Sequence, residues 1–398
     1  MIPRGKLYIS NKDLVTGIYY CFTDCFKPQK TDTSEQNTNK LICLSVRTGF
    51  DLVLSALNFP AGAEILVTAI NIPGMFKIIA GHNLIPTPLP VNKQTLSISP
   101  ADLESAITPA TKAILITHLF GAIMETDEIN AIARKHKLIV FEDCAQAYAG
   151  NAYKGNPKSD VVMFSFGLIK TNTAIRGAII NIKNPALYAD VSSRNEQYDL
   201  QDTTSFLKKL FKVLLIKLLS TKTIYTGFYV LVKAIGKDFE EVLASFTRGF
   251  PGDDVFKQIR YRPCLPNKKL LQKKLSNFSQ RTIDARIQLA NDILPHLPND
   301  YKIGMRNTNH TYWVLPVETR YPGELISFLR SNGFDASQKA SSLIKLSAAE
   351  RIAKPEELVL EHIVYLPAYP SMRKKDRDKL IQLLVKHKLI AQRGEPVS

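Results

Sequence analysis

Two short stretches near the middle of the chain decide its fold: FEDCAQA at residues 141–147 and MFSFGLIK at residues 163–170. Each begins in an apolar run typical of a buried strand and then continues into polar side chains. The first stretch places Asp143 just past its run, and the second places Ser165 and Lys170 just past its own. Parallel strands meet with their carboxyl ends at one edge of the sheet, so we expect these three side chains to lie together.

Alternating strand and helix patterns extend around these stretches, from about Leu41 to Ile182. One helix start is clear, because Ser99 can cap it and Pro100 suits its first position. The alternation is typical of an α/β protein in which helices wrap a mainly parallel sheet. The short apolar runs expected to form strands are Glu64–Val67, Leu84–Leu89, Ala113–Thr117, Leu138–Phe141 and Val161–Phe164.

An acid and a lysine in one site are the groups that pyridoxal phosphate requires. A lysine amine forms the imine to the cofactor aldehyde, and a carboxylate keeps the pyridine nitrogen protonated, so that the ring accepts electrons. A helical pattern follows Arg47, Thr48 and Gly49. These residues can bind a phosphate group through their backbone N–H groups and a hydroxyl. Taken alone, a Thr-Gly pair before a helix is more often simple capping.

The composition indicates a globular protein with a basic surface. With 398 residues, 45% of them hydrophobic, the chain can bury a large core and divide into two domains. The 52 Lys and Arg residues against 36 Asp and Glu give a net charge of +16, which favours an anionic partner. A phosphorylated substrate or an anionic membrane fits better than nucleic acid, because the chain shows no zinc finger, RNP-like motif or arginine-rich tail.

Cysteine usage and the start of the chain bear on the compartment. The five cysteines are an odd number without CxxC spacing, so we expect free thiols and neither a disulfide framework nor a metal site. No early segment joins a basic start to a long apolar run and a cleavage site. The expected localisation is therefore cytoplasmic.

Together these residues carry a family resemblance. The segment from about Leu41 to Ile182 resembles the DegT-type sugar aminotransferases, which are pyridoxal-phosphate enzymes of the aspartate aminotransferase fold. The resemblance implies an α/β large domain with a mainly parallel sheet of seven-stranded type and a smaller α+β C-terminal domain. The implied units are a cofactor-binding domain with an N-terminal arm at 1–185, an inserted basic and apolar helical segment at 186–250, and a small domain at 251–398.

The resemblance also assigns roles to individual residues. The family motif Glu-Asp-x-Ala-Gln implies that Asp143 binds the ring nitrogen and that Gln146 lies near the ring hydroxyl. Its Ser-Phe-x-x-x-Lys motif implies that Ser165 contacts the phosphate and that Lys170 forms the imine. The helix opening that binds the phosphate in the family corresponds to Arg47, Thr48 and Gly49.

Some positions depart from the family pattern. Ile72 stands where the family has an aromatic that stacks on the ring, and Arg260 replaces an Asn in an Asn-Tyr-Arg element contributed across the dimer to the phosphate. Arg176 replaces the usual Glu after the lysine, and such arginines suit a phosphate or carboxylate ligand. Weaker candidates for substrate contact are His118, Arg176, His310 and Trp313, although a lone His or Trp is more often a packing residue.

The segment 186–250 contains two apolar runs, Phe206–Leu219 and Ile224–Ile235. Neither reaches the roughly 20 apolar residues needed to span a bilayer. The segment is either a helical hairpin packed on the core or on a dimer partner, or a peripheral membrane contact formed by residues 206–235. The lysines at 208, 209 and 212 share one helical face and Lys217 lies opposite, which favours packing.

Beyond this segment we expect the α+β small domain. Its predicted elements are a long polar helix pattern from Pro266 to Ile293, a strand at Tyr312–Val317, and helices at Pro322–Ser331 and Lys375–His387.

The expected activity is amino transfer from glutamate or glutamine to a keto group on a sugar or on a phosphorylated or lipid-linked acceptor, by a homodimer. Two alternatives stay open: other pyridoxal-phosphate chemistry, such as a lyase or decarboxylase, and a binding protein that has lost turnover. Family dehydratases replace the lysine with histidine, so Lys170 argues against that branch.

Overall fold

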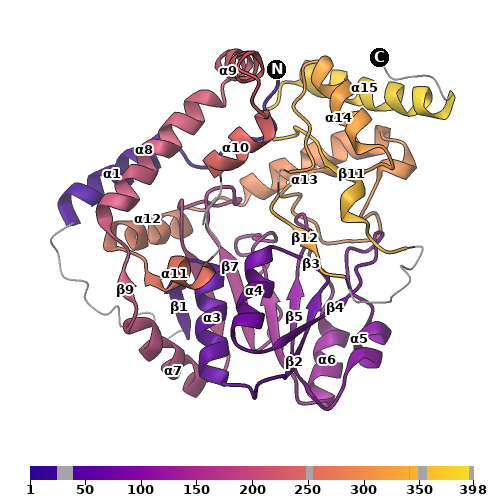
Figure 1. Ribbon diagram of the computed structural model, residues 1–398. Helices are drawn as coiled ribbons and strands as arrows, with labels where there is room; N and C mark the ends of the chain where they lie inside the picture. Colours follow the sequence, from indigo (N-terminus) through magenta and orange to yellow (C-terminus); the bar gives the residue numbers. More distant parts are fainter. Residues whose placement is uncertain (25–38, 248–253, 340, 348–355, 394–398) are drawn as a thin grey trace.

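The centre of the molecule is a seven-stranded sheet, shown in Figure 1 by a computed structural model that describes residues 1–24, 39–247, 254–339, 341–347 and 356–393. The strand order is β1-β8-β7-β6-β5-β2-β4, and β8 alone among these strands runs antiparallel to its neighbours. The predicted α/β fold with a mainly parallel sheet is confirmed. The strands are β1 (Lys40–Cys43), β2 (Glu64–Thr68), β4 (Ile85–Leu89), β5 (Thr111–Thr117), β6 (Ile139–Asp143), β7 (Val161–Ser165) and β8 (Ala178–Ile182).

Helices cover both faces of this sheet, which explains why its strands are continuous apolar runs. Along β2, the buried Ile65 and Val67 pack with the helices α3 and α4, whereas Leu66 packs on the other face beside α5 and α6. Ser99 caps α5 as predicted, because its side chain accepts a hydrogen bond from the Asp102 N–H. The helices named here are α3 (Val46–Leu57), α4 (Pro73–Gly81), α5 (Pro100–Ala106) and α6 (Asp127–Lys135).

The C-terminal part has its own core around a two-stranded antiparallel sheet of β11 and β13. Ile2 belongs to this core, and its N–H donates to the Gly333 carbonyl over 2.7 Å, so the first residues of the chain pack on the C-terminal part. The elements are α12 (Leu265–Ser276), α13 (Arg281–Ile293), β11 (Pro316–Glu318), α14 (Pro322–Ser331), β13 (Ile363–Tyr365), α15 (Lys374–Arg393) and short 3-10 helices at Leu294–His296, Asn299–Tyr301 and Leu360–His362.

Two predictions for this part need correction. The strand expected at Tyr312–Val317 is limited to β11, because Thr311 and Val314 donate their N–H groups to the loop that follows β5 rather than to a strand. The helix pattern from Pro266 to Ile293 is broken into α12 and α13.

The segment after β8 forms several helices, from α7 at the lower left of Figure 1 through α8 at the upper left to α9 at the top. Its helix α8 packs against α1 and α12. The axes of α8 and α9 differ by 95°, so these two helices do not lie antiparallel to each other. Among the described residues no single helix is long and apolar enough to cross a membrane, although α8 and α9 together meet that test by length and composition. The elements are α1 (Asn11–Asp24), α7 (Pro185–Glu196), α8 (Thr203–Leu219), α9 (Lys222–Ala234), α10 (Phe239–Thr247) and α11 (Val255–Ile259).

Short strand pairs complete the architecture. One of them joins Ile70–Asn71 (β3) to Ile344–Lys345 (β12), and the other joins Asp199–Leu200 (β9) to Tyr261–Arg262 (β10). The first pair fastens the residues after β2 to the C-terminal part. The four described cysteines, Cys21, Cys43, Cys144 and Cys264, are buried free thiols as predicted, and Cys25 lies outside the described residues.

Candidate active site

The structure brings Asp143 and Lys170 together, because β6 and β7 are neighbours in the sheet. Asp143 is the last residue of β6 and is buried, and Lys170 follows β7 in a turn where its N–H donates to the Gly167 carbonyl over 3.0 Å. Burial raises the pKa of Asp143, and the Ala145 N–H and the Lys170 charge oppose that rise. The acid and the lysine thus stabilise each other's charged form.

Lys170 has an amine that is easily deprotonated. Burial lowers the pKa of Lys170 to about 8; the Asp143 carboxylate opposes this effect, and the Arg47 charge adds to it. At neutral pH a useful fraction of this amine is neutral, and the neutral form is the nucleophile and base.

Trp313 lies against Lys170 from the C-terminal part of the chain. The Lys170 Nζ atom is 4.4 Å from the centre of the indole ring, within the range of a cation–π contact. The indole Nε1–H donates to the Ile169 carbonyl over 3.0 Å, so the ring is fixed beside the turn that carries the lysine. Trp313, a weak substrate candidate by sequence, is therefore placed as a partner of the lysine.

His310, the other candidate from this region, packs against its own neighbour. Its ring stacks on Tyr312 with centroids 3.9 Å apart, and its Nδ1 accepts the Tyr312 N–H over 2.9 Å. Burial lowers the pKa of His310 to about 3, so the ring is neutral near pH 7. These contacts hold the backbone that carries Trp313.

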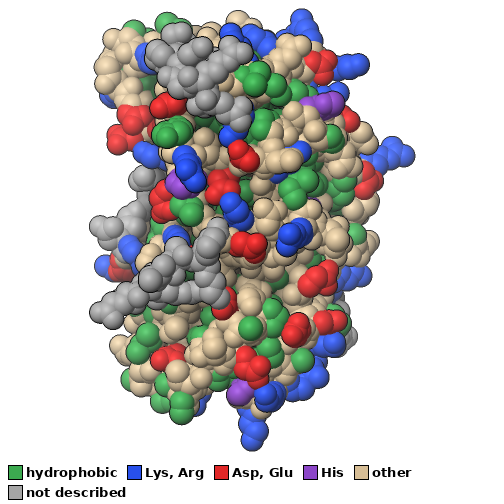
Figure 2. All heavy atoms as spheres, turned by 90° about the vertical axis from the view of Figure 1, so that its right-hand side faces the viewer, with side chains coloured by type: hydrophobic (Ala, Val, Ile, Leu, Met, Phe, Trp, Pro, Cys, Tyr) green, Lys and Arg blue, Asp and Glu red, His purple; other side chains and the backbone are tan. Residues whose placement is uncertain are grey.

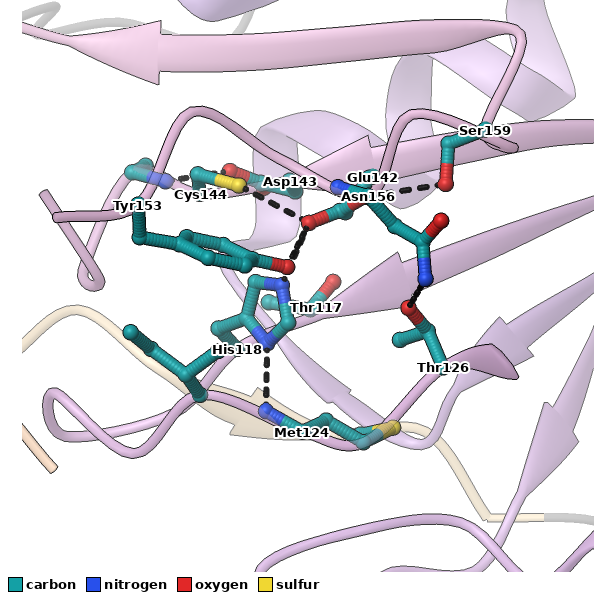
Figure 3. A network of polar contacts seen from close by, with 12 residues as sticks. Thr117, His118, Met124, Thr126, Glu142, Asp143, Cys144, Tyr153, Asn156 and Ser159 are labelled. Atoms are coloured by element: carbon teal, nitrogen blue, oxygen red, sulfur yellow. Dashed lines mark hydrogen bonds and ion pairs between the residues drawn. The ribbon is translucent and has the colours of Figure 1, made fainter. Parts of the chain in front are cut away.

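A buried network surrounds Glu142, the residue that precedes Asp143 in β6 (Figure 3). One carboxylate oxygen accepts from the Nε2 of His118 over 3.0 Å and from the Tyr153 hydroxyl, and the other accepts from Ser159 and from the Asn156 N–H, each over 2.9 Å. Burial alone would raise the pKa of Glu142, but these donors lower it to about 2. The charged Glu142 therefore fixes the end of β6.

His118 belongs to this network and is fully buried. Its Nδ1 accepts the Met124 N–H over 2.9 Å, which leaves Nε2 to carry the proton donated to Glu142. His118, Glu142 and Cys144 present donor atoms within 4.8 Å of one another, but burial and Glu142 raise the Cys144 thiol pKa well above its usual value. We assign the group to hydrogen bonding, with His118 in a supporting role rather than at a substrate.

Polar residues also hold the loop that follows β5. The Oε1 atom of Gln146 accepts the Phe120 N–H over 2.9 Å, where the backbone takes a left-handed turn at φ 59°. Asn71 donates through Nδ2 to the Thr117 hydroxyl over 2.7 Å and lies close enough to Asp143 to oppose the rise of its pKa. The sequence did not predict a role for Asn71, because only the pairing of β3 with the C-terminal part reveals its position.

The residues predicted to bind the phosphate make different contacts in the structure. Arg47 lies within electrostatic range of Lys170, whereas the Thr48 hydroxyl donates to the Ile259 carbonyl over 2.8 Å. Gly49 allows α3 to approach the sheet, because a Cβ atom there would lie 2.3 Å from the Cγ1 of Ile180. The Ser165 hydroxyl accepts the Gly167 N–H over 3.4 Å at the end of β7.

The positions that depart from the family pattern make different contacts. Arg260 donates from Nε and Nη2 to the buried Asp51 of the same chain, over 3.0 and 3.1 Å. Burial lowers the pKa of Arg176 to about 10, and burial together with the Arg176 charge lowers the pKa of Arg47 to about 10. Ile72 is the residue before α4, and its N–H donates to the Asn71 side chain over 2.7 Å.

Comparison with known proteins shows that the part of the chain that carries this site is similar to one family. Residues 38–200 match the sequence profile of the DegT/DnrJ/EryC1/StrS aminotransferase family. The match covers less than half of the chain. The matched residues include Asp143, Ser165 and Lys170, so both the acid and the lysine that the fold brings together lie among them. The helices α8 and α9 lie beyond the end of the match.

A curated relative is similar over a shorter stretch. An L-glutamine:2-deoxy-scyllo-inosose aminotransferase of Micromonospora echinospora is 39% identical over 97 residues, which are 24% of this chain and 23% of that enzyme. The chain thus matches less than a third of the length of this relative.

Two solved structures share the whole architecture. The sugar aminotransferase CalS13 from Micromonospora echinospora has a TM-score of 0.68 at 18% identity and covers 96% of this chain and 99% of its own. The GDP-4-keto-6-deoxy-D-mannose-3-dehydratase from E. coli, solved with hydrated PLP, has a TM-score of 0.70 at 15% identity and covers 96% and 99%. These likenesses show the fold, which is that of aspartate aminotransferase as the resemblance predicted.

Proposed function

We propose that this protein is a pyridoxal-phosphate-dependent aminotransferase that takes an amino group from glutamate or glutamine and delivers it to a keto group on a sugar-like acceptor. The observation that carries the proposal is the interaction of Asp143 with Lys170 inside the segment that matches the family. The name of the curated relative, which includes L-glutamine and an inosose, supports the choice of donor and acceptor.

The residues present fit the cofactor. Pyridoxal phosphate, when bound, supplies an aldehyde for a lysine amine and a ring that accepts electrons from a substrate carbanion. Asp143 would hold the ring nitrogen, and Lys170 would bond to the aldehyde carbon. Arg47 and Ser165 would hold the phosphate, and Gln146 would lie near the ring hydroxyl. The support is chemical, because a buried carboxylate faces an amine of lowered pKa.

In the proposed reaction the chain's own groups bind and move protons. The amine of Lys170, when it is not bonded to the cofactor, would take a proton from the α carbon of the amino donor. It would then return this proton to the carbon to which the amine had been bonded. Asp143 would place its negative charge beside the protonated ring nitrogen. The Ala145 N–H donates to Asp143 and stabilises that charge. Trp313 limits the positions that the Lys170 amine can take.

Several finer features stay proposals. Arg176 and Arg47 suit an acceptor that carries a phosphate or a carboxylate, whether the acceptor is a free sugar or is linked to a lipid. The roles of Thr48, Gly49, Ile72 and Arg260 at the cofactor, the division of the chain at 185 and 250, and the cytoplasmic localisation also stay predictions. A homodimer is expected from the family resemblance, and light scattering of the purified protein would test it.

The deciding experiment is the absorption spectrum of the purified protein from about 300 to 500 nm, before and after excess glutamine or glutamate. We expect a band from lysine-bound cofactor that at least one donor bleaches. Lys170→Ala should keep cofactor bound without that band, and Lys135→Ala, at an exposed lysine on α6, should match the native protein.

The other outcomes separate the alternatives. A band that neither donor bleaches would indicate a lyase, a decarboxylase or another donor. A protein that shows no band even after addition of cofactor would contradict the proposal and favour a binding protein. An unchanged band in Lys170→Ala would contradict the role of that lysine.

A further inference from the structure

Exposed apolar side chains are concentrated on α1, α8 and α9. Of the 17 large apolar side chains that are exposed among the described residues, ten lie on these three helices or directly after α9. These ten, with the exposed lysines of α8 and α9, form what we name the basic-apolar surface. Its apolar members are Val15, Tyr19, Phe22, Phe211, Leu215, Leu218, Ile224, Val230, Leu231 and Ile235.

On each helix most of these side chains follow helical spacing and form one outward stripe. The members on α1 are at positions 15, 19 and 22, and those on α8 are at 211, 215 and 218. The stripe on α9 runs from position 224 through 231 to 235. Such spacing places the members on α1, those on α8, and Ile224, Leu231 and Ile235 on one face of their helix, whereas Val230 lies about 100° around α9 from Leu231. Each of the three helices therefore turns an apolar stripe to solvent.

The inward faces of the same helices belong to the protein core. Phe206, Leu210 and Val213 on α8 are buried, and α8 approaches α1 so closely that a Cβ at Gly17 would lie 2.9 Å from a methyl group of Leu210. Helices fixed in this way cannot leave the core to span a bilayer. Their exposed stripes can still rest in the interfacial layer of one.

The charged residues of this surface differ between its helices: α1 carries Lys12, Asp13 and Asp24, whereas α8 and α9 carry lysines alone. The sequences of α8 and α9 contain six lysines and no acidic residue. Lys208, Lys212 and Lys233 are exposed beside the apolar stripes, whereas Lys217 turns inward and donates to the Ile9 carbonyl over 2.6 Å. Burial, Arg176 and Lys212 lower the pKa of Lys209 to about 7, so it is the least basic of the set.

The opposite side of the molecule differs. Figure 2 shows the side that lies to the right in Figure 1, away from α1 and α8, and there Lys and Arg side chains are interspersed with Asp and Glu. Mixed charge of that kind is typical of a face that meets only solvent. The charges of α8 and α9, which are lysines alone, thus differ from the mixed charge of that face.

We propose that the basic-apolar surface docks this protein on an anionic membrane, with the apolar stripes in the interfacial layer and the lysines on lipid headgroups. A second copy of the chain is the weaker occupant, because a two-fold interface would set the lysines of α8 and α9 against the same lysines of the partner. Anionic lipid offers both the apolar layer and the opposite charge. The proposal does not rest on the proposed enzymatic activity.

The test is sedimentation of the full chain with vesicles of phosphatidylcholine, alone or mixed with phosphatidylglycerol. We expect binding only to the anionic vesicles, strong at about 0.1 M salt and weak at about 1 M, where screening is stronger. The double variant Lys208→Gln, Lys233→Gln should bind roughly 25-fold more weakly. Its matched control is Lys77→Gln with Lys135→Gln, at exposed lysines on α4 and α6, and should bind like the native protein.

The apolar contribution has its own variants. Phe211→Ser with Leu231→Ser should reduce vesicle binding at both salt concentrations, whereas Ile85→Ser with Met305→Ser, at similarly exposed positions elsewhere, should not. Thermal unfolding followed by circular dichroism checks that each variant is folded. Equal binding to neutral and anionic vesicles, or none to either, would overturn the proposal. It would also fail if the stripe variants turn a dimer into a monomer in light scattering while vesicle binding is absent.

Discussion

The ammonium group of Lys170 lies 4.4 Å from the centre of the Trp313 ring, although 143 positions of sequence separate the two residues (313 − 170 = 143). The lysine belongs to the sheet-bearing part and the tryptophan to the part that carries the C-terminal core. The reactive amine is therefore held from both parts of the molecule at once. A change in how the two parts pack would therefore change the contacts of this amine.

Removing the indole ring should make the Lys170 amine less basic. The contact of a cation with an aromatic face favours the charged lysine by about 1 kcal/mol, so Trp313→Leu should lower the pKa of Lys170 by roughly one unit. Trp313→Phe keeps a ring and should have a smaller effect. The measurement is the pH dependence of the rate at which the protein captures pyridoxal phosphate, and a midpoint that does not move in Trp313→Leu would contradict the contact.

The capture of the cofactor aldehyde should depend on pH with a midpoint near 8. Because burial lowers the pKa of Lys170 from 10.5 to about 8, roughly a tenth of the amine is neutral at pH 7 and roughly nine tenths at pH 9. The capture rate should thus rise across this range and then level off.

The same profile tests the partner acid. The carboxylate of Asp143 raises the pKa of Lys170, so Asp143→Asn should shift the midpoint to lower pH. Asp127→Asn, at an exposed acid on α6, serves as the control and should leave the midpoint in place. A shift to higher pH in Asp143→Asn would show that the two side chains do not interact as described.

Glu142 should contribute stability that acid removes. The pKa of Glu142 is about 2 in the folded chain and 4.5 in the unfolded one, so its contribution, roughly 3 kcal/mol, is present above pH 4.5 and is lost as the pH falls toward 2. Glu142→Gln places an amide among donors and should cost about 2 to 4 kcal/mol at pH 7.

Urea unfolding at pH 7 and at pH 3 would measure this effect. The difference in the free energy of unfolding between the native protein and Glu142→Gln should shrink at the lower pH. Glu104→Gln alters an exposed acid and should change little at either pH. A difference that stays constant with pH would argue against a charged Glu142.

Gly49→Ala should destabilise the large domain by overpacking. The added methyl would lie 2.3 Å from Cγ1 and 2.4 Å from Cδ1 of the fully buried Ile180, at an expected cost of about 1 to 3 kcal/mol. Adding Ile180→Ala should recover part of that loss, so the double variant should be less unstable than the two single effects predict together. Gly227→Ala on α9 meets open space and is the control.

The sequence predicted the central sheet and its helices well because their signals are local. The strands Glu64–Val67 and Val161–Phe164 and the helix after Ser99 were found by apolar runs and capping residues, which depend only on neighbouring positions. The prediction failed at Tyr312–Val317, where the apolar pattern suits a strand but the backbone donors are used by another loop.

The candidate site was predictable to the extent that it follows strand order. By itself the sequence determined that Asp143 and Lys170 sit at the carboxyl ends of buried strands, since parallel strands present those ends at one edge. Tertiary structure alone decided that Trp313 lies on the lysine, that Asp51 holds Arg260 and that Asn71 reaches Asp143. These contacts join residues far apart in the chain, and no local pattern encodes which distant surfaces pack together.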